Sequence, residues 1–191
     1  MPLARGGYPA NSTDFLFLGS PADTSKVPRF NLPRTDCTSD TAALTTAVLT
    51  TVALPLNAGD LVTKLAVKSG ATAAGTPTNY WVALYDLTGA LISQSADQTS
   101  TAWAANTTKD LALATPYYVV TPGVYYAGIM VKATTPPTLI GVTLGTAGAS
   151  TGVLSTDKIL SQTSGSALTT TAPATIATPT AIAAVPLVVA H

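Results

Sequence analysis

The chain has 191 residues, of which 47% are hydrophobic and only 9% charged, and its formal net charge is zero. Zero net charge excludes a general nucleic-acid binder, which needs clustered Lys and Arg to displace counterions. The apolar content excludes a disordered chain, and the length suits one β domain with an arm or one large sandwich. Soluble domains usually carry about a quarter charged residues. A surface this poor in charge indicates either coverage by neighbouring subunits or a Thr-rich β surface.

The first 40 residues differ from the rest, because they contain all three arginines of the chain and a short apolar run at 15–18. Several prolines in this stretch favour an extended segment without a core of its own. Arg and aromatic residues are favoured in interfaces. We therefore predict an anchoring arm over residues 1–40 that contacts a partner through Arg5, Phe15, Phe17, Arg29 and Arg34. The alternative is a loop wrapped on its own domain.

Neither a secretion signal nor a membrane span is expected. No apolar segment follows the first residues, so we expect synthesis in a cytoplasm. The uncharged run at 159–190 is interrupted by Ser, Thr, Gly and Pro too often for a continuous apolar helix. We accordingly predict no membrane partner.

From residue 42, short apolar runs alternate with turn residues, which is typical of β-strands. Alternate apolar positions predict a long strand over 44–56. The run at 61–68 predicts a half-buried strand, with Leu61 and Leu65 facing inward and Lys64 facing outward.

Two later strands are apolar on both faces, at 80–87 and 124–131. This pattern indicates a central strand covered on both sides, or a strand with one face in the core and the other in an interface. Between 86 and 89 the sequence predicts a hairpin turn in which Gly89 adopts a positive φ.

Roughly eight short strands with no convincing helix predict an all-β protein, a jelly-roll-like antiparallel β-sandwich with an extended N-terminal arm. We place the arm at 1–40 and the sandwich core at 41–145. The Thr/Ala-rich segment at 146–191 either completes the sandwich or contacts a neighbour.

The residues that usually carry chemistry are scarce. His191 is the sole histidine and ends the sequence, where a base is seldom held by a third group. Cys37 lacks a neighbouring His or basic group that would favour a thiolate. Asp36 and Asp40 offer oxygen ligands for calcium, but their spacing matches no EF-hand loop. We predict no enzyme activity, no metal site and no cofactor.

The aromatic residues are the remaining chemical feature. Trp81, Trp103 and Tyr126 are candidates for a platform on which sugar rings stack, since a ring face offers apolar contact. Because most aromatics lie inside apolar strands, the alternative that they form core and subunit contacts is favoured over the platform.

Three stretches carry a family resemblance: WVALYDLTGALISQSADQ at 81–98, AWAANT at 102–107 and TPGVYYAGIMV at 121–131. Over residues 42–144 the chain resembles small β-sandwich structural proteins of tailed bacteriophages that infect actinobacteria. In that family such domains are minor tail proteins or head-decorating proteins. The resemblance implies a virion surface protein, made in the bacterial cytoplasm and often trimeric, and it supplies no site residues.

Together these observations predict a non-enzymatic virion structural protein on the particle exterior, most simply a capsid decoration protein that stabilises the shell through subunit contacts. The expected partners are other virion proteins and further copies of this chain in a trimer. A minor tail protein, or a carbohydrate-binding module that attaches to a host surface glycan, is the alternative.

Overall fold

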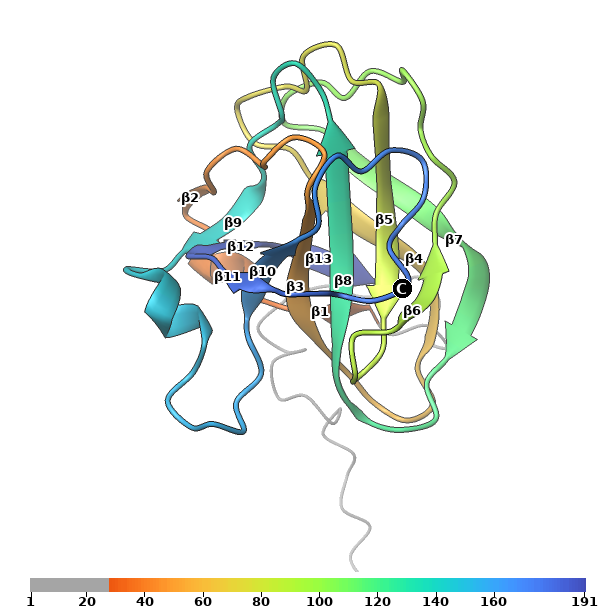
Figure 1. Ribbon diagram of the computed structural model, residues 1–191, viewed down its shortest axis with the longest axis vertical. Helices are drawn as coiled ribbons and strands as arrows, with labels where there is room; N and C mark the ends of the chain where they lie inside the picture. Colours follow the sequence, from red (N-terminus) through yellow and green to blue (C-terminus); the bar gives the residue numbers. More distant parts are fainter. Residues whose placement is uncertain (1–27) are drawn as a thin grey trace, which may run out of the picture.

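The computed structural model describes residues 28–191, which form three antiparallel sheets (Figure 1). The largest sheet has the order β11-β10-β3-β8-β5-β6, with bounds Thr180–Ala181, Ser161–Ser164, Leu49–Leu56, Gly123–Lys132, Asn79–Tyr85 and Leu91–Gln94. The second has the order β1-β13-β4-β7, with bounds Arg29–Phe30, Val188–Ala190, Leu61–Lys68 and Thr108–Tyr118. The third has the order β12-β9-β2, with bounds Ala184–Pro186, Ile140–Thr143 and Ser39–Asp40.

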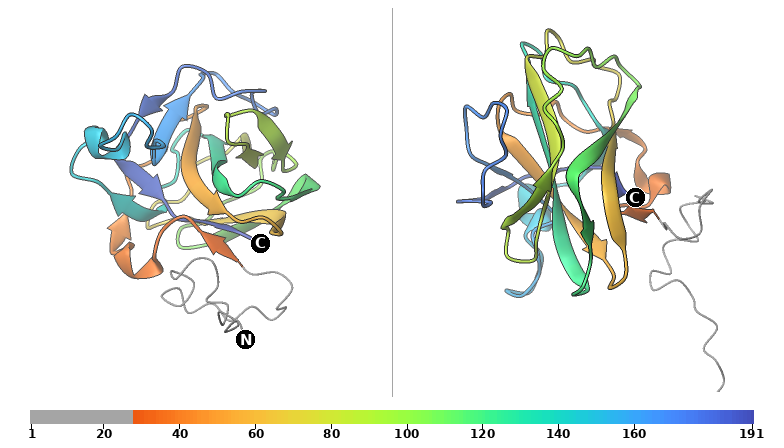
Figure 2. Two further views of the ribbon diagram at one scale, coloured as in Figure 1. Left: turned by 90° about the horizontal axis from the view of Figure 1, so that it is seen from below. Right: turned by 90° about the vertical axis from the view of Figure 1, so that its right-hand side faces the viewer.

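The two larger sheets face each other as the layers of a sandwich, which the right-hand view of Figure 2 shows from the side. The chain passes between the two larger sheets four times, because β4 and β7 belong to the second sheet while β3, β5, β6 and β8 belong to the largest. Apolar side chains from both sheets meet between the layers, among them Leu54, Leu65, Val82 and Ile129. The predicted all-β antiparallel sandwich is therefore confirmed.

The outer face of the largest sheet is also covered, and the covering segment comes from the same chain. Residues 168–176 cross this face and place Leu168, Ala172 and Ile176 against the side chains of β5 and β8. This second core explains why the strands at 80–87 and 124–131 are apolar on both faces. Of the two interpretations offered for that pattern, coverage on both sides is the one the fold adopts.

The segment after residue 146 supplies strands to all three sheets, as β10, β11, β12 and β13. Strand β10 extends the largest sheet through pairing with β3, and β13 lies between β1 and β4. Residues 146–191 therefore complete the sandwich.

The boundary predicted for the N-terminal arm is wrong for its last part. Strand β1 pairs with β13, and β2 pairs with β9, so residues 29–40 belong to the folded domain. The alternative of a segment wrapped on its own domain is correct here, because β13 and β9 each offer an edge that pairs with it. A deletion that tests the arm should remove residues 1–27 and no more.

Two local expectations also differ from the structure. The strand predicted over 44–56 begins only at Leu49, because Ala47 has a φ of 56° that ends extended pairing. In β4 the register shifts between Val62 and Lys64. This bulge buries Val62 and leaves Leu61 39% exposed, although an uninterrupted period of two directs Leu61 inward.

Two short 3-10 helices, η2 (Arg34–Asp36) and η3 (Ala147–Ser150), are the helical elements among residues 28–191. No helix in this part of the chain is long and apolar enough to cross a membrane.

Candidate functional site

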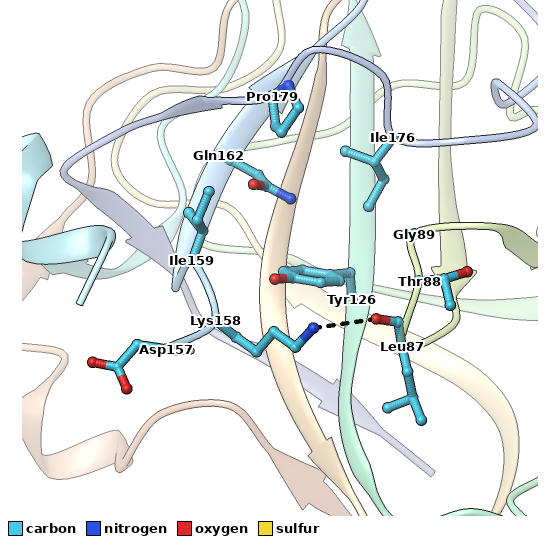
Figure 3. A pocket seen from close by; sticks show the side chains of 10 residues that line it. All are labelled: Leu87, Thr88, Gly89, Tyr126, Asp157, Lys158, Ile159, Gln162, Ile176 and Pro179. Atoms are coloured by element: carbon cyan, nitrogen blue, oxygen red, sulfur yellow. Dashed lines mark hydrogen bonds between the residues drawn. The ribbon is translucent and has the colours of Figure 1, made fainter. Parts of the chain in front are cut away.

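A pocket of about 260 Å³ opens beside the outer face of the largest sheet (Figure 3). Four segments meet there: the β5–β6 hairpin, strand β8, the segment that runs into β10, and the C-terminal segment that covers the sheet. Its lining is formed by Leu87, Thr88, Gly89, Tyr126, Asp157, Lys158, Ile159, Gln162, Ile176 and Pro179.

The hairpin that forms one wall is shaped by a carboxylate inside the turn. Asp86 Oδ1 accepts hydrogen bonds from the Thr88 N–H at 2.8 Å, the Thr88 hydroxyl at 2.7 Å and the Ala90 N–H at 2.9 Å. Burial raises the pKa of Asp86, but hydrogen bonds from Thr88, Gly89 and Ala90 outweigh it and leave that pKa below its usual value. Gly89 has a φ of 87°, as predicted for this turn.

The opposite wall is fixed by a second carboxylate. Asp157 Oδ2 accepts hydrogen bonds from the N–H groups of Val153 at 2.8 Å and Leu154 at 2.9 Å. These two bonds lower the pKa of Asp157, so the side chain is an anion at neutral pH. Its neighbour Lys158 donates from Nζ to the Leu87 carbonyl oxygen at 3.4 Å, which spans the pocket from one wall to the other.

Tyr126 from β8 forms the floor. Burial raises the pKa of its hydroxyl, and a hydrogen bond from the Ile159 backbone partly offsets this. Gln162 from β10 lies next to it with only 3% of its surface exposed. Figure 3 shows the Gln162 carboxamide directed into the pocket, and its side chain makes no hydrogen bond to the protein within residues 28–191.

Of the three aromatic residues predicted to stack on sugars, Trp81 and Trp103 are in the interior, with 1% and 2% of their surfaces exposed. Trp81 Nε1 donates to the Thr169 carbonyl oxygen at 2.7 Å. Trp103 packs against Tyr80 with ring centroids 5.3 Å apart. Both tryptophans therefore lie in the core, as in the interpretation favoured over the platform, and neither can stack on a sugar. Tyr126 alone lines a pocket, and its 7% exposure makes it a floor rather than a platform.

The predicted partner contacts have mixed outcomes. Arg5, Phe15 and Phe17 lie outside the described residues. Arg29 is 8% exposed, and its guanidinium binds both carboxylate oxygens of Asp60, at 2.7 and 2.8 Å. It therefore holds β1 to the domain and is wrong as a partner contact. Arg34 is exposed on η2.

The other residues considered for chemistry have structural partners. Asp40 Oδ2 accepts from the Ala71 N–H at 2.6 Å and the Thr138 hydroxyl at 2.8 Å. Within residues 28–191, no three His, Cys, Asp or Glu side chains gather as metal ligands. Burial, then the charge of Asp36, raises the pKa of Cys37. His191 Nε2 lies 2.9 Å from Asp110 Oδ1, so a carboxylate does hold this terminal histidine.

Sequence reasoning missed two exposed apolar clusters. The name loop cluster is used for Val153, Leu154 and Leu160, which belong to the loop between η3 and β10 and have 97%, 65% and 43% of their surfaces exposed. The turn cluster consists of Leu61, Tyr118 and Val120, with 39%, 60% and 73% exposed. The first had a signal, since 153–154 and 159–160 are apolar islands within a Thr/Ser-rich stretch. The second depends on the β4 bulge, which no local pattern reveals.

Comparison with known proteins adds no identification: no family model matches the chain, and no curated protein matches it.

Proposed function

We propose that this chain is a non-enzymatic structural protein on the exterior of a tailed-bacteriophage virion, most simply a capsid decoration protein. The observation that carries the proposal is the pair of exposed apolar clusters. Large apolar side chains that project from a folded domain are typical of sites that another protein covers. The low charge of the chain and its resemblance to phage β-sandwich proteins point the same way.

The positions of the two clusters favour a ring of identical subunits. In Figure 1 the loop that carries the loop cluster projects at the lower left, whereas the β3–β4 and β7–β8 turns lie toward the lower right. Two different patches on separate sides of one subunit suit a head-to-tail contact, which closes into a ring when the rotation permits. In this ring, which is a trimer, the loop cluster of each subunit packs on the turn cluster of the next subunit.

Apolar chemistry supports this pairing. Val153 and Leu154 sit at the tip of a loop whose backbone is held by Asp157, so they are presented to a partner without a large ordering cost. Tyr118 and Val120 offer an aromatic ring and a branched side chain as the complementary surface. Tyr is among the residues enriched in protein interfaces.

The ring is tested by the mass of the protein in solution. Light scattering on the full chain is expected to give three times the 19.2 kDa mass of one chain. Val120→Asp and Leu154→Asp are each expected to be monomers, because a buried unpaired charge opposes the contact. A mixture of the two variants is expected to form a heterodimer, since each supplies the cluster that the other has lost.

Thr101→Asp, an exposed change between β6 and β7, is the control and should remain a trimer. Substitutions at such exposed positions usually change stability by about 0.5 kcal/mol or less. A wild-type chain that stays monomeric at every concentration would contradict the ring. Self-association of Val120→Asp alone would show instead that the loop cluster contacts itself.

The place on the virion is tested by co-sedimentation. The full chain is mixed with purified heads or purified tails that lack it, and we expect saturable binding to heads. Sedimentation with tails alone would assign the minor tail role. If the chain sediments with neither particle, the virion proposal fails.

A further inference from the structure

Gln162 makes the pocket at the β5–β6 hairpin unusual. Buried polar side chains nearly always have hydrogen-bond partners. Only 3% of the surface of Gln162 is exposed, and its carboxamide is directed into the pocket without a side-chain hydrogen bond to residues 28–191, so it is open to a ligand there (Figure 3). We infer that this pocket binds one neutral monosaccharide unit, with the Gln162 carboxamide as its central polar contact.

The polar groups of the pocket require a ligand that both donates and accepts hydrogen bonds. The Gln162 carboxamide has one acceptor oxygen and two N–H donors. The Lys158 ammonium has three donors, of which one is engaged at 3.4 Å by the Leu87 carbonyl. Asp157 is not part of this set, because its Oδ2 binds two backbone N–H groups and Figure 3 shows its carboxylate directed away from the pocket. Adjacent hydroxyl groups of a sugar satisfy such a set, since each hydroxyl donates and accepts.

The charges of the lining select a neutral ligand. Lys158 and Asp157 are consecutive and are the two charged side chains of the pocket. Their charges are opposite, so the formal charge of the lining is zero and a net charge of either sign on the ligand gains little. A neutral hydroxyl can accept from Lys158 Nζ, which Figure 3 shows directed across the pocket.

The remaining lining is apolar and fits the C–H face of a sugar ring. Ile176 and Pro179 form one side, Leu87 lies on the other, and Tyr126 closes the bottom. Tyr126 is too deeply covered for a ring to stack across its whole face, so it contributes a small apolar floor. The combination of apolar walls and a few convergent polar groups is characteristic of ligand sites.

The size of the pocket limits the ligand to one ring. Its volume of about 260 Å³ lies just below the range of about 300–1,000 Å³ that holds drug-sized ligands. Thr88, Asp157, Lys158 and Pro179 are exposed at its rim, so further sugar units of a chain can extend into solvent.

The experiment is a titration of the full chain with methyl glycosides of glucose, galactose, mannose and N-acetylglucosamine, followed by NMR. At least one is expected to bind in the millimolar range, as a ligand with so few atoms should. Binding should shift the side-chain amide resonances of Gln162. Gln162→Leu is expected to weaken binding at least tenfold, and Lys158→Ala several-fold.

Two controls remove the same side-chain types elsewhere. Gln98→Leu removes an amide that donates only to the nearby Ala96 carbonyl, and Lys68→Ala changes the exposed last residue of β4. Both should bind as the wild type does. Thermal melts of all variants show whether Gln162→Leu keeps the fold, and Lys158→Ala, at an exposed position, provides the second test if it does not.

The inference is overturned if none of the four glycosides binds, or if both pocket variants keep wild-type affinity. It is also overturned if glucuronic acid or N-acetylneuraminic acid binds more tightly than the neutral sugars, because the charge argument then fails. The virion-ring proposal is tested independently of the sugar site, since its variants Val120→Asp and Leu154→Asp change neither Gln162 nor Lys158.

Discussion

Replacement of Trp81 by Ala is expected to destabilise the domain by about 3–5 kcal/mol, the usual cost of removing a buried tryptophan. Trp81 is 1% exposed and is the largest side chain of the second core, which holds the C-terminal segment against the sheet. The change also removes the donor that binds the Thr169 carbonyl at 2.7 Å. Domains are stable by about 5–15 kcal/mol in total, so this loss is a large fraction.

Urea unfolding, followed by tryptophan fluorescence of the remaining Trp103 and by circular dichroism, measures the loss. Trp81→Phe is expected to cost less than Trp81→Ala, because it keeps a ring but loses the N–H and some volume. Thr170→Ala, on the exposed surface of the same segment, is the control and should change stability by about 0.5 kcal/mol or less. Unchanged unfolding of Trp81→Ala would revive the sugar-platform interpretation, in which this residue contributes to binding and not to folding.

Replacement of Arg29 by Ala is expected to cost about 3–5 kcal/mol, the typical penalty for removing one partner of a buried ion pair. The side chains of Arg29 and Asp60 are 9% and 12% exposed. Both carboxylate oxygens of Asp60 are bound by the guanidinium, and Oδ2 also accepts from the Asn57 N–H at 2.7 Å. Without Arg29 this carboxylate stays shielded from water with no cation beside it.

A double-mutant cycle with Asp60→Asn separates the pair from its surroundings. Asp60→Asn keeps an acceptor for Asn57 but removes the charge, so Arg29→Ala combined with Asp60→Asn should be more stable than Arg29→Ala alone. Lys68→Ala, at an exposed position of the same sheet, is the control. If Arg29→Ala melts like the wild type but fails to assemble, Arg29 is a partner contact after all.

Trp81 and Arg29 also show how much of the structure can be predicted from the sequence. Period-two patterns and turn residues predict the strands around Lys64, Val82 and Ile129 and the turn at Gly89, because those signals are local. The role of Trp81 depends on Thr169, and that of Arg29 on Asp60, residues that lie far along the chain. Composition identifies Arg29 as a residue suited to an interface, but only the pairing of β1 with β13 shows which surface it meets.

The lining of the pocket is even harder to predict from the sequence than the contacts of Trp81 and Arg29. Gln162 occupies a Ser/Thr-rich stretch that has no apolar periodicity, and its strand has a partner, β3, more than a hundred residues earlier. Tyr126 was identified as an aromatic of interest, but the side chains that surround it come from three other segments. A site assembled from four distant parts of the chain leaves no spacing pattern in the sequence.

The pairing of early strands with late ones has a consequence during synthesis. Strand β3 needs β10, and β1 needs β13, so the largest sheet is complete only after residue 181 and the second only after residue 190 has left the ribosome. Contacts between residues so far apart in sequence make folding slow, in the range of about milliseconds to seconds for β-sandwiches. The nascent chain therefore has open strand edges until these late strands have been made.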